Sequence, residues 1–136
     1  MTALARLLFP APAIRRSPMQ LFGWWESRRP IYNLIVGVAG LVTLASFQVI
    51  SWLPPHLGLH FPWPLIIVYG LCANACYTFG YAIEALLERM WGDEVSPVGP
   101  TLFRHGLVFS VGLTLLPIAV AWLGYVANLV GHLVSK

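Results

Sequence analysis

Glu84 is the first candidate for chemistry, because it is a carboxylate near the end of the second long apolar stretch of the chain. An ionisable group inside a membrane-crossing helix is costly and marks a functional site by default. Asn74, Tyr77 and Tyr81 lie on the same or neighbouring faces of a helix and add an amide and two hydroxyls. These four residues are the candidate intramembrane functional group, as a proton-linked site, a ligand site or part of a path for a small solute.

A structural role for Glu84 is the alternative interpretation. The residue lies close enough to the end of its apolar stretch for the carboxylate to reach the membrane interface. Arg89 and Arg104 are the candidate partners for an ion pair there. The sequence leaves both interpretations open.

No other set of side chains has the spacing of a catalytic or metal site. His56 and His60 stand four residues apart, but the prolines around them disfavour the helix that this spacing needs, and further ligands are missing. Cys72 and Cys76 stand one helical turn apart, which suits a disulfide poorly, so we expect reduced, small packing residues. Motifs of phosphate loops, nucleophile elbows and zinc proteases are also lacking. We therefore expect no catalytic residue, no metal and no cofactor.

Small and weakly polar residues recur at three- and four-residue spacing in each apolar stretch, which places them on one face of a helix. In lipid, such residues let two helix backbones approach closely and gain dispersion contacts and hydrogen bonds. We interpret them as helix-packing faces, with a solute path along the third stretch as the alternative. The residues are Gly37 and Gly40 in the first stretch, Gly70, Ala73 and Gly80 in the second, and Gly106, Ser110, Thr114, Ala121, Gly124 and Asn128 in the third.

Three apolar stretches must position all of these residues. They cover about residues 31–53, 65–87 and 106–131, and proline-rich segments separate them. Each is long enough to cross a hydrocarbon core of about 30 Å at about 1.5 Å per residue. The third apolar pattern runs over about residues 101–134, which exceeds one upright span. We expect an interfacial first turn or two, then a tilted span, then a projecting end, with tilt or a kink at Pro117 taking up more of the excess length.

Residues 1–30 are predicted to form a cytoplasmic leader followed by an amphipathic interfacial helix, ahead of a three-helix transmembrane domain at 31–136. Ser17 and Gln20 have the spacing of a capping box, and Pro30 is expected to end the helix near Arg29. Indole rings and arginines are typical of the headgroup level of a membrane. The predicted interface residues are Trp24, Trp25, Arg28 and Arg29.

The composition excludes most soluble classes. Hydrophobic residues make up 58% of the 136 residues and charged residues only 10%, whereas soluble domains carry about 25% charged residues. An ordinary soluble enzyme, a disordered regulator and a nucleic-acid-binding domain are therefore excluded, and the lipid bilayer is the first expected partner. Five of the eight basic residues precede the first apolar stretch, and the connection after that stretch has none. The positive-inside rule then predicts a cytoplasmic N-terminus and a C-terminus on the outer side.

The segment from Trp24 to Asn33 (WWESRRPIYN) leads directly into a glycine-bearing apolar stretch. It resembles the opening of a group of small bacterial membrane proteins of unknown function, which have a W/F-x-E-x-R-R-x-x-Y-N-like start. The resemblance implies an integral protein of the bacterial inner membrane. It carries over no activity and no catalytic residue.

The predicted fold is all-α, with three transmembrane helices after an interfacial helix. We expect a non-enzymatic membrane protein that packs against a partner, either a second copy of itself or a larger membrane complex, with no nucleic acid involved. The alternative function is a homo-oligomeric transporter or channel for a small solute that uses Glu84 and the polar residues near it.

Overall fold

The computed structural model describes residues 17–54, 63–91 and 98–134, and these ranges are almost entirely helical. The helices are α2 (Pro18–Glu26), α3 (Arg29–Trp52), α4 (Trp63–Trp91) and α5 (Gly99–Val134). The prediction of an all-α fold is confirmed. Three helical stretches are long and apolar enough to cross a membrane: α2 with α3, then α4, then α5. Residues 1–16 of the predicted leader lie outside the described residues.

The capping box at the start of α2 is confirmed, whereas the predicted end of this helix is wrong. The Ser17 side chain accepts from the Gln20 backbone, and the Gln20 side chain accepts from the Ser17 backbone. The helix ends at Glu26, and Pro30 lies in the first turn of α3. Proline has no N–H for the carbonyl four residues earlier, and its ring crowds that carbonyl. Pro30 therefore ends α2 at Glu26. It is tolerated in the first turn of α3, where a backbone N–H has no partner within the helix.

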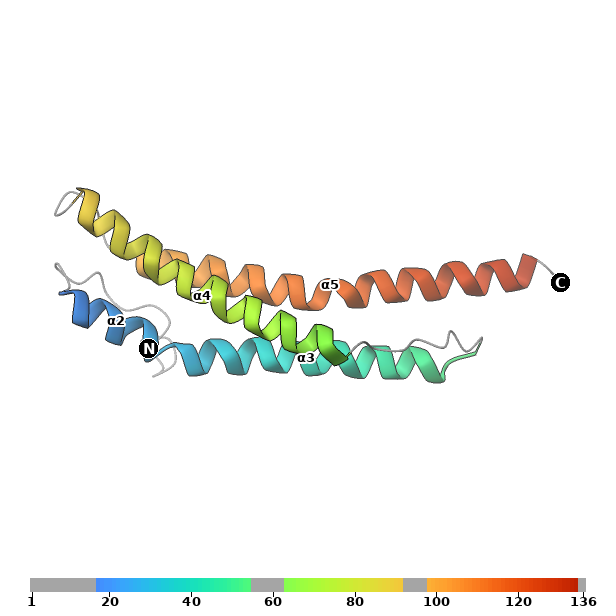
Figure 1. Cartoon of the computed structure of the whole chain (residues 1–136). Coiled ribbons are helices and arrows are strands. Elements are labelled where there is room, and N and C mark those ends of the chain that lie inside the picture. The colour runs from blue at the N-terminus through green and yellow to red at the C-terminus, as the bar shows by residue number, and fades with distance from the viewer. Residues whose placement is uncertain (1–16, 55–62, 92–97, 135–136) are drawn as a thin grey trace, which may run out of the picture.

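The lipid-facing orientation expected for the indole of Trp25 is also wrong. Leu21 and Trp25 are 1% and 2% exposed, and α2 packs against α4 and α3. Figure 1 shows α2 continuing in roughly the direction of α3 rather than lying across the bundle. The physical reason is that Trp25 has a partner inside the protein, the carboxylate of Glu84. The side of α2 that carries Leu21 and Trp25 thus forms part of the bundle core, while Met19 and Phe22 are exposed.

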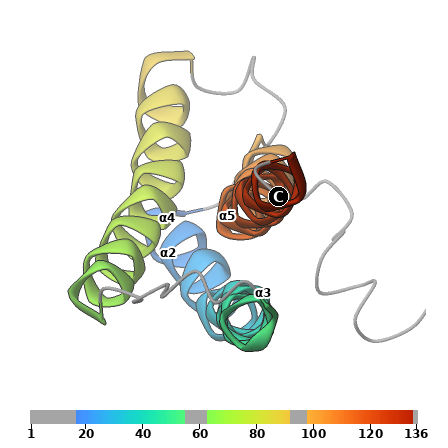
Figure 2. The ribbon, with the colours of Figure 1, turned by 90° about the vertical axis from the view of Figure 1, so that its right-hand side faces the viewer.

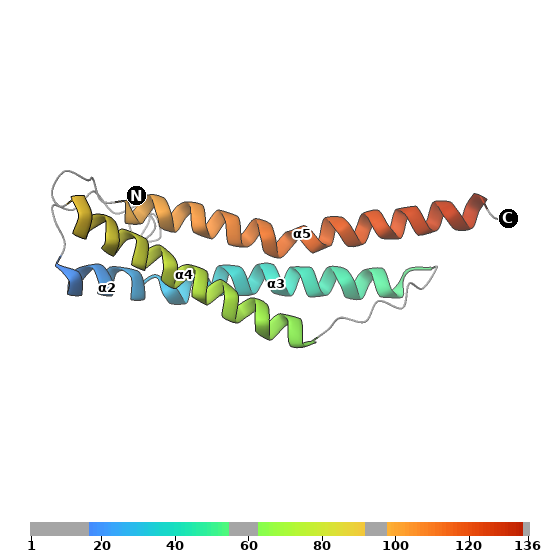
Figure 3. The ribbon, with the colours of Figure 1, turned by 45° about the horizontal axis from the view of Figure 1, so that its top comes forward.

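The three long helices differ in how closely they pack. Helices α3 and α5 run side by side along much of their length, and α4 crosses them at a slant (Figures 1 and 2). Helix α4 packs on α5 and α2, while its N-terminal end diverges from α3 (Figure 3). The buried face of α3 repeats every three or four residues until its last turn, through Tyr32, Val36, Ala39, Thr43 and Ile50.

Helix α5 is one continuous helix of 36 residues, and it begins before the residue expected for the third span. At about 1.5 Å per residue it is roughly 54 Å long. Pro117 lies at its middle, and Figure 3 shows a gentle bend in this part of the helix. A proline inside a helix removes one backbone hydrogen bond and bends the axis. The excess length is thus taken up within a single bent helix.

The outer faces of the bundle are strongly apolar. Large hydrophobic side chains are exposed along all three long helices, including Leu34, Leu71 and Leu123, which are 66%, 67% and 71% exposed. An exposed apolar surface of this extent marks contact with lipid or with another protein. The fold therefore leaves most of α4 and α5 available to surroundings that are themselves apolar.

Candidate functional site

Glu84 lies where three helices meet. Its side chain, on α4, has no exposed surface. The indole Nε1 of Trp25 in α2 donates to Oε2 at 2.6 Å, and the backbone N–H of Gly99 at the start of α5 donates to Oε1 at 2.9 Å. Hydrogen bonds to a carboxylate are stronger than those between neutral groups, and the N-terminus of a helix favours negative charge. Glu84 thus fastens α2 and the start of α5 to α4.

Two glycines make this approach possible. A Cβ at Gly99 would meet both carboxylate oxygens of Glu84, so any other residue would displace either the carboxylate or the start of α5. A Cβ at Gly80 would lie 2.8 Å from Cη2 of Trp25, so this glycine makes room for the indole ring. Gly80 was predicted as a packing residue, and the structure places it at the contact between α4 and α2.

An aromatic cluster surrounds Trp25, the indole partner of Glu84. The ring of Tyr77 lies 5.2 Å from that of Trp25 and 6.2 Å from that of Phe103, nearly edge to face in both pairs. The Tyr77 hydroxyl donates to the backbone carbonyl of Trp25. Edge-to-face packing of this kind adds to the burial of each ring. The cluster therefore joins α2, α4 and α5 around Trp25.

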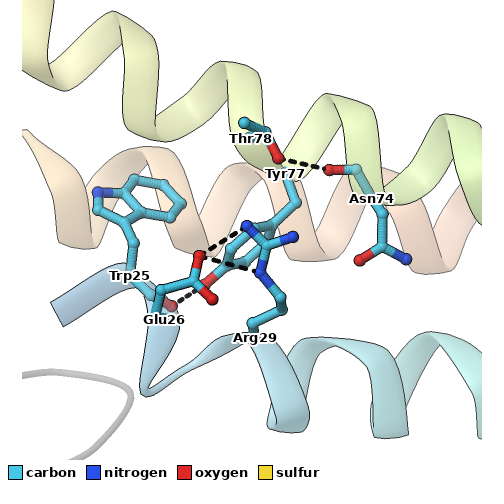
Figure 4. Close-up of polar contacts among 6 residues, drawn as sticks. All are labelled: Trp25, Glu26, Arg29, Asn74, Tyr77 and Thr78. Carbon is cyan, nitrogen blue, oxygen red and sulfur yellow. Dashed lines mark hydrogen bonds and ion pairs between the residues drawn. The ribbon is translucent and has the colours of Figure 1, made fainter. Parts of the chain in front are cut away.

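The arginines of the turn between α2 and α3 flank this cluster. The Arg28 guanidinium lies 3.8 Å from the centre of the Trp24 ring and donates to the Trp24 carbonyl. Arg29 forms an ion pair with Glu26 at 2.7 Å, beside the Tyr77 ring (Figure 4). Arg28, one of the predicted interface residues, is buried, because its side chain packs back onto α2. Arg29 remains partly exposed.

A second group of polar contacts, the hydroxyl network, lies further along the bundle. The Tyr32 and Ser110 hydroxyls are 2.8 Å apart, and Tyr69 bonds both the Thr114 hydroxyl and the Ser110 carbonyl. Thr43 donates to the carbonyl of Thr114 at 2.8 Å. Side-chain hydrogen bonds between membrane helices contribute about 0.6 kcal/mol each on average. The network therefore holds α3, α4 and α5 in register.

The four predicted functional residues do not converge on one point. Tyr77 and Glu84 both contact Trp25. Asn74 donates to the carbonyl of Gly70 in its own helix, and Tyr81 lies edge to face with the ring of Phe22. Trp25 and Gly99 were not among the partners predicted for Glu84.

The predicted packing face of α5 divides into two parts. Ser110 and Thr114 are buried in the hydroxyl network, and Ala121 is half-buried. Gly106, Gly124 and Asn128 are exposed. Only part of the predicted packing face of α5 therefore packs against α3 and α4.

Four of the predicted small residues of α3 and α4 lie around an open groove of about 620 Å³ between α3, α4 and α5. Gly37, Gly40, Gly70 and Ala73 all line it. A Cβ at Gly37 or Gly70 would meet no atom within 4 Å, and one at Gly40 would only touch Thr114. Their absent side chains therefore leave space instead of bringing α3 against α4, which departs from the predicted packing role.

Within the described residues, no group of three or more His, Cys, Asp or Glu side chains lies close enough to hold a metal ion. His56 and His60 fall outside these residues. Cys72 and Cys76 are free, in agreement with the prediction that they are reduced, and both are exposed on α4.

The comparisons with known proteins add no relative. No family model matches the chain, and no curated protein or solved structure is significantly similar to it. The site residues that sequence reasoning missed are Gly99, Phe103 and Tyr32. Only Gly99 had a visible signal, as a glycine between two prolines at the start of an apolar stretch.

Proposed function

We propose that this chain is a multi-pass protein of a bacterial inner membrane that binds another membrane protein through α5 and catalyses no reaction. The partner is a second copy of the chain or a subunit of a larger complex. The observation that carries the proposal is a row of glycines on α5 that the fold of the single chain leaves uncovered.

The glycine row consists of Gly106, Gly124 and Gly131. Eighteen residues separate the first two, which is five turns at 3.6 residues per turn, and seven residues separate the last two, close to two turns. All three are exposed, and a Cβ at any of them would meet no atom within 4 Å. Intramolecular packing therefore gives no reason for glycine there, whereas close approach of a partner helix does.

Asn128 supports the same face independently. Its side chain is exposed one turn beyond Gly124, and it makes no hydrogen bond within residues 17–54, 63–91 and 98–134. An amide that faces lipid lacks partners, while one at a helix interface can bond across it. The polar residue and the glycine row thus favour the same surface for a partner.

The position of Glu84 supports a structural role over the transport alternative. Its carboxylate is fully buried and accepts hydrogen bonds from Trp25 and Gly99. A solute that used this carboxylate would have to displace the contacts that hold α2 and α5. The polar residues near it also face different neighbours, so they do not form a common path.

The test is extraction of the full chain from its native membrane with a mild detergent or a polymer, followed by native mass spectrometry. The wild type is expected to appear with a stoichiometric partner or as a defined oligomer. Leucine at Gly124 or Gly131 places a large side chain on the proposed contact, so it should remove most of the associated form while leaving insertion intact.

Gly112→Leu is the matched control, because Gly112 is exposed on a different face of α5 and a Cβ there also meets nothing within 4 Å. It should associate like the wild type. Association that survives both Gly124→Leu and Gly131→Leu would remove the glycine row as an interface. A wild-type chain that is always monomeric would contradict the proposed function itself.

The proposed orientation has the N-terminus in the cytoplasm and the C-terminus outside. The five arginines ahead of the first apolar stretch and the lack of basic residues in the next connection support it. In right-side-out spheroplasts, a membrane-impermeant maleimide should label Val134→Cys and spare Met90→Cys. The reverse pattern would show the opposite orientation.

A further inference from the structure

The open groove between α3, α4 and α5 has a wall without charged side chains. Within the part of the chain that the structure describes, no residue that lines it is an aspartate, glutamate, lysine, arginine or histidine. Most lining residues are apolar, and glycines leave space where side chains would otherwise fill the groove. The hydroxyls of Thr43, Tyr69 and Thr114 are already used in the hydroxyl network. The polar groups that remain for a ligand are the side-chain amides of Asn33 and Asn74.

The two amides belong to the same level of the bundle. The Tyr32 hydroxyl donates to the carbonyl of Ala73 at 3.2 Å. Asn33 and Asn74 are the next residues of these two helices, and both line the groove. The Asn33 side chain is exposed and makes no hydrogen bond within the described ranges of the chain. Asn74 uses one of its two amide N–H groups on the carbonyl of Gly70. Hydrogen-bond donors from two helices are therefore available at this level of the groove.

This level lies in the interior of the membrane. Asn74 is 11 residues from the start of α4, which is about 16 Å at 1.5 Å per residue. Asn33 is 15 residues from the start of the apolar stretch Pro18–Trp52 and 19 residues from its end. A hydrocarbon core of about 30 Å has its centre about 15 Å from either surface. A ligand that meets the two amides therefore lies near the centre of the bilayer.

A neutral ligand suits this depth, whereas a charged one does not. An ion at the centre of a bilayer is costly unless an opposite charge accompanies it. Arg29 lies one helical turn before Asn33, but it forms an ion pair with Glu26 at 2.7 Å, so it offers no net charge. A carbonyl group fits the two amides, because its oxygen can accept from both. It also has no N–H or O–H of its own that the hydrocarbon would leave without a partner.

The size of the groove suits a small molecule rather than a helix. It has a volume of about 620 Å³ and follows eleven residues of α3, from Asn33 to Leu44, which is about 16 Å. A helix about 10 Å across would fill about 1,250 Å³ over this length. Sites of about 300–1,000 Å³ with apolar walls and a few polar groups are typical of small ligands. A lipid acyl chain would fill the space, but it would leave both amides without a partner, which is costly in hydrocarbon.

We infer that the groove binds a small neutral molecule with a mostly apolar body and one carbonyl group, whose oxygen accepts from Asn33 and Asn74. The body lies along Gly37 and Gly70, where the absent side chains leave space. Such a molecule dissolves in the membrane and reaches the groove from the lipid. The inference rests on the membrane location proposed above, and it does not depend on the glycine row of α5.

Photolabelling with benzophenone tests where such a molecule binds. Benzophenone is neutral and apolar, has one carbonyl group, and attaches to nearby C–H bonds under ultraviolet light. The full chain, purified in a mild detergent, is irradiated at increasing benzophenone concentrations, and mass spectrometry counts and maps the adducts. Labelling of the wild type should saturate at one adduct per chain, on residues that line the groove.

Leucines placed in the groove provide the matched variants. A Cβ at Gly37 or Gly70 meets no atom within 4 Å, so a leucine there occupies the space of the ligand without disturbing the core. At the concentration that half-saturates the wild type, Gly37→Leu and Gly70→Leu should reduce labelling by about fivefold or more, as loss of about 1 kcal/mol of binding free energy predicts. Gly112→Leu adds the same side chain on an exposed face of α5 outside the groove, and it should label like the wild type.

The contact with the amides has its own test. Fluorenone and fluorene are flat competitors of the same shape, and only fluorenone has a carbonyl group. The preference for fluorenone over fluorene in blocking the label should be about fivefold smaller in Asn33→Leu than in the wild type, as loss of one net hydrogen bond predicts. Comparing the two proteins cancels any difference in how the competitors partition into detergent.

Labelling that never saturates, or that is equal in the wild type and all three leucine variants, would overturn the inference. An unchanged preference for fluorenone in Asn33→Leu would overturn it as well and would leave a lipid acyl chain as the occupant. If Gly37→Leu abolished an oligomer that Gly124→Leu left intact, the groove would be a helix interface and not a ligand site. These outcomes are measured in detergent, whereas a chain that failed to partition into membranes would refute the membrane location, so the two failures are distinguishable.

Discussion

Gly99→Ala should destabilise the fold strongly, although it changes one hydrogen atom to a methyl group. The new Cβ would meet both carboxylate oxygens of Glu84, which is fully buried and cannot turn toward water. Overpacking in a core costs about 1–3 kcal/mol, and loss of a hydrogen bond to a charged group costs about 1.5–3 kcal/mol. The free energy of unfolding should therefore fall by about 2.5–6 kcal/mol.

Gly106→Ala is the control on the same helix. A Cβ at Gly106 meets nothing within 4 Å, and alanine is favoured over glycine inside a helix by about 1 kcal/mol. This variant should be as stable as the wild type or slightly more stable. Both variants are compared by equilibrium unfolding in mixed detergent micelles, followed by circular dichroism.

A double-mutant cycle separates the contact with Glu84 from any other effect of alanine at this position. In a Glu84→Ala background the added methyl group no longer meets a carboxylate. The cost of Gly99→Ala should then shrink to within about 1 kcal/mol, which gives a coupling energy well above that of independent sites. Equal stability of Gly99→Ala and Gly106→Ala, or no coupling to Glu84, would refute the role assigned to this carboxylate.

Three further variants probe the other contacts by the same unfolding assay. Trp25→Phe removes the indole that donates a hydrogen bond to Glu84, so it should lower the free energy of unfolding by about 1.5–3 kcal/mol. Glu84→Gln should lower the free energy of unfolding less than Glu84→Ala, because glutamine keeps an oxygen that can accept this bond. Gly80→Ala places a Cβ 2.8 Å from the Trp25 ring and should cost about 1–3 kcal/mol, a loss that Trp25→Ala should relieve. Thr43→Val removes the donor to Thr114 and should cost about 0.6 kcal/mol, while Ser46→Val, whose hydroxyl bonds only within α3, should cost less.

The architecture was predictable because helix length and apolar composition are properties of each segment alone. Three apolar stretches of about 23 residues or more and a capping box at Ser17 are visible without tertiary contacts. The end of α2 was less predictable, since the effect of Pro30 falls on the carbonyl of Glu26 four residues earlier. A proline indicates that a helix is interrupted nearby. Whether it follows the end of one helix or lies in the first turn of the next depends on which of the two helices packs better against the rest of the protein.

The candidate site was predictable only in part. Glu84 stood out because a carboxylate in an apolar helix is rare, but its partners Trp25 and Gly99 lie 59 and 15 residues away in the chain. Nothing in their local patterns distinguishes an indole at a lipid interface from one that bonds a buried carboxylate. Periodicity likewise placed the small residues of each helix on one face, and it could not say which of them meet a neighbour and which border a groove.

The measurement that tests the central claim most directly uses the two native cysteines. Cys72 and Cys76 are exposed on α4, and Cys76 is 13 residues from Trp63 and 15 from Trp91, about 20 Å from either end. Their protection from a water-soluble maleimide would therefore report lipid around the helix and not burial within the protein. Met90→Cys in a cysteine-free background is the control, because Met90 is exposed next to the end of α4.

In permeabilised membranes, where both surfaces are open to the reagent, the account predicts labelling of Met90→Cys and protection of Cys72 and Cys76. All three should react after denaturation in SDS. Labelling of Cys72 and Cys76 as fast as Met90→Cys before denaturation would contradict the claim that α4 crosses a membrane.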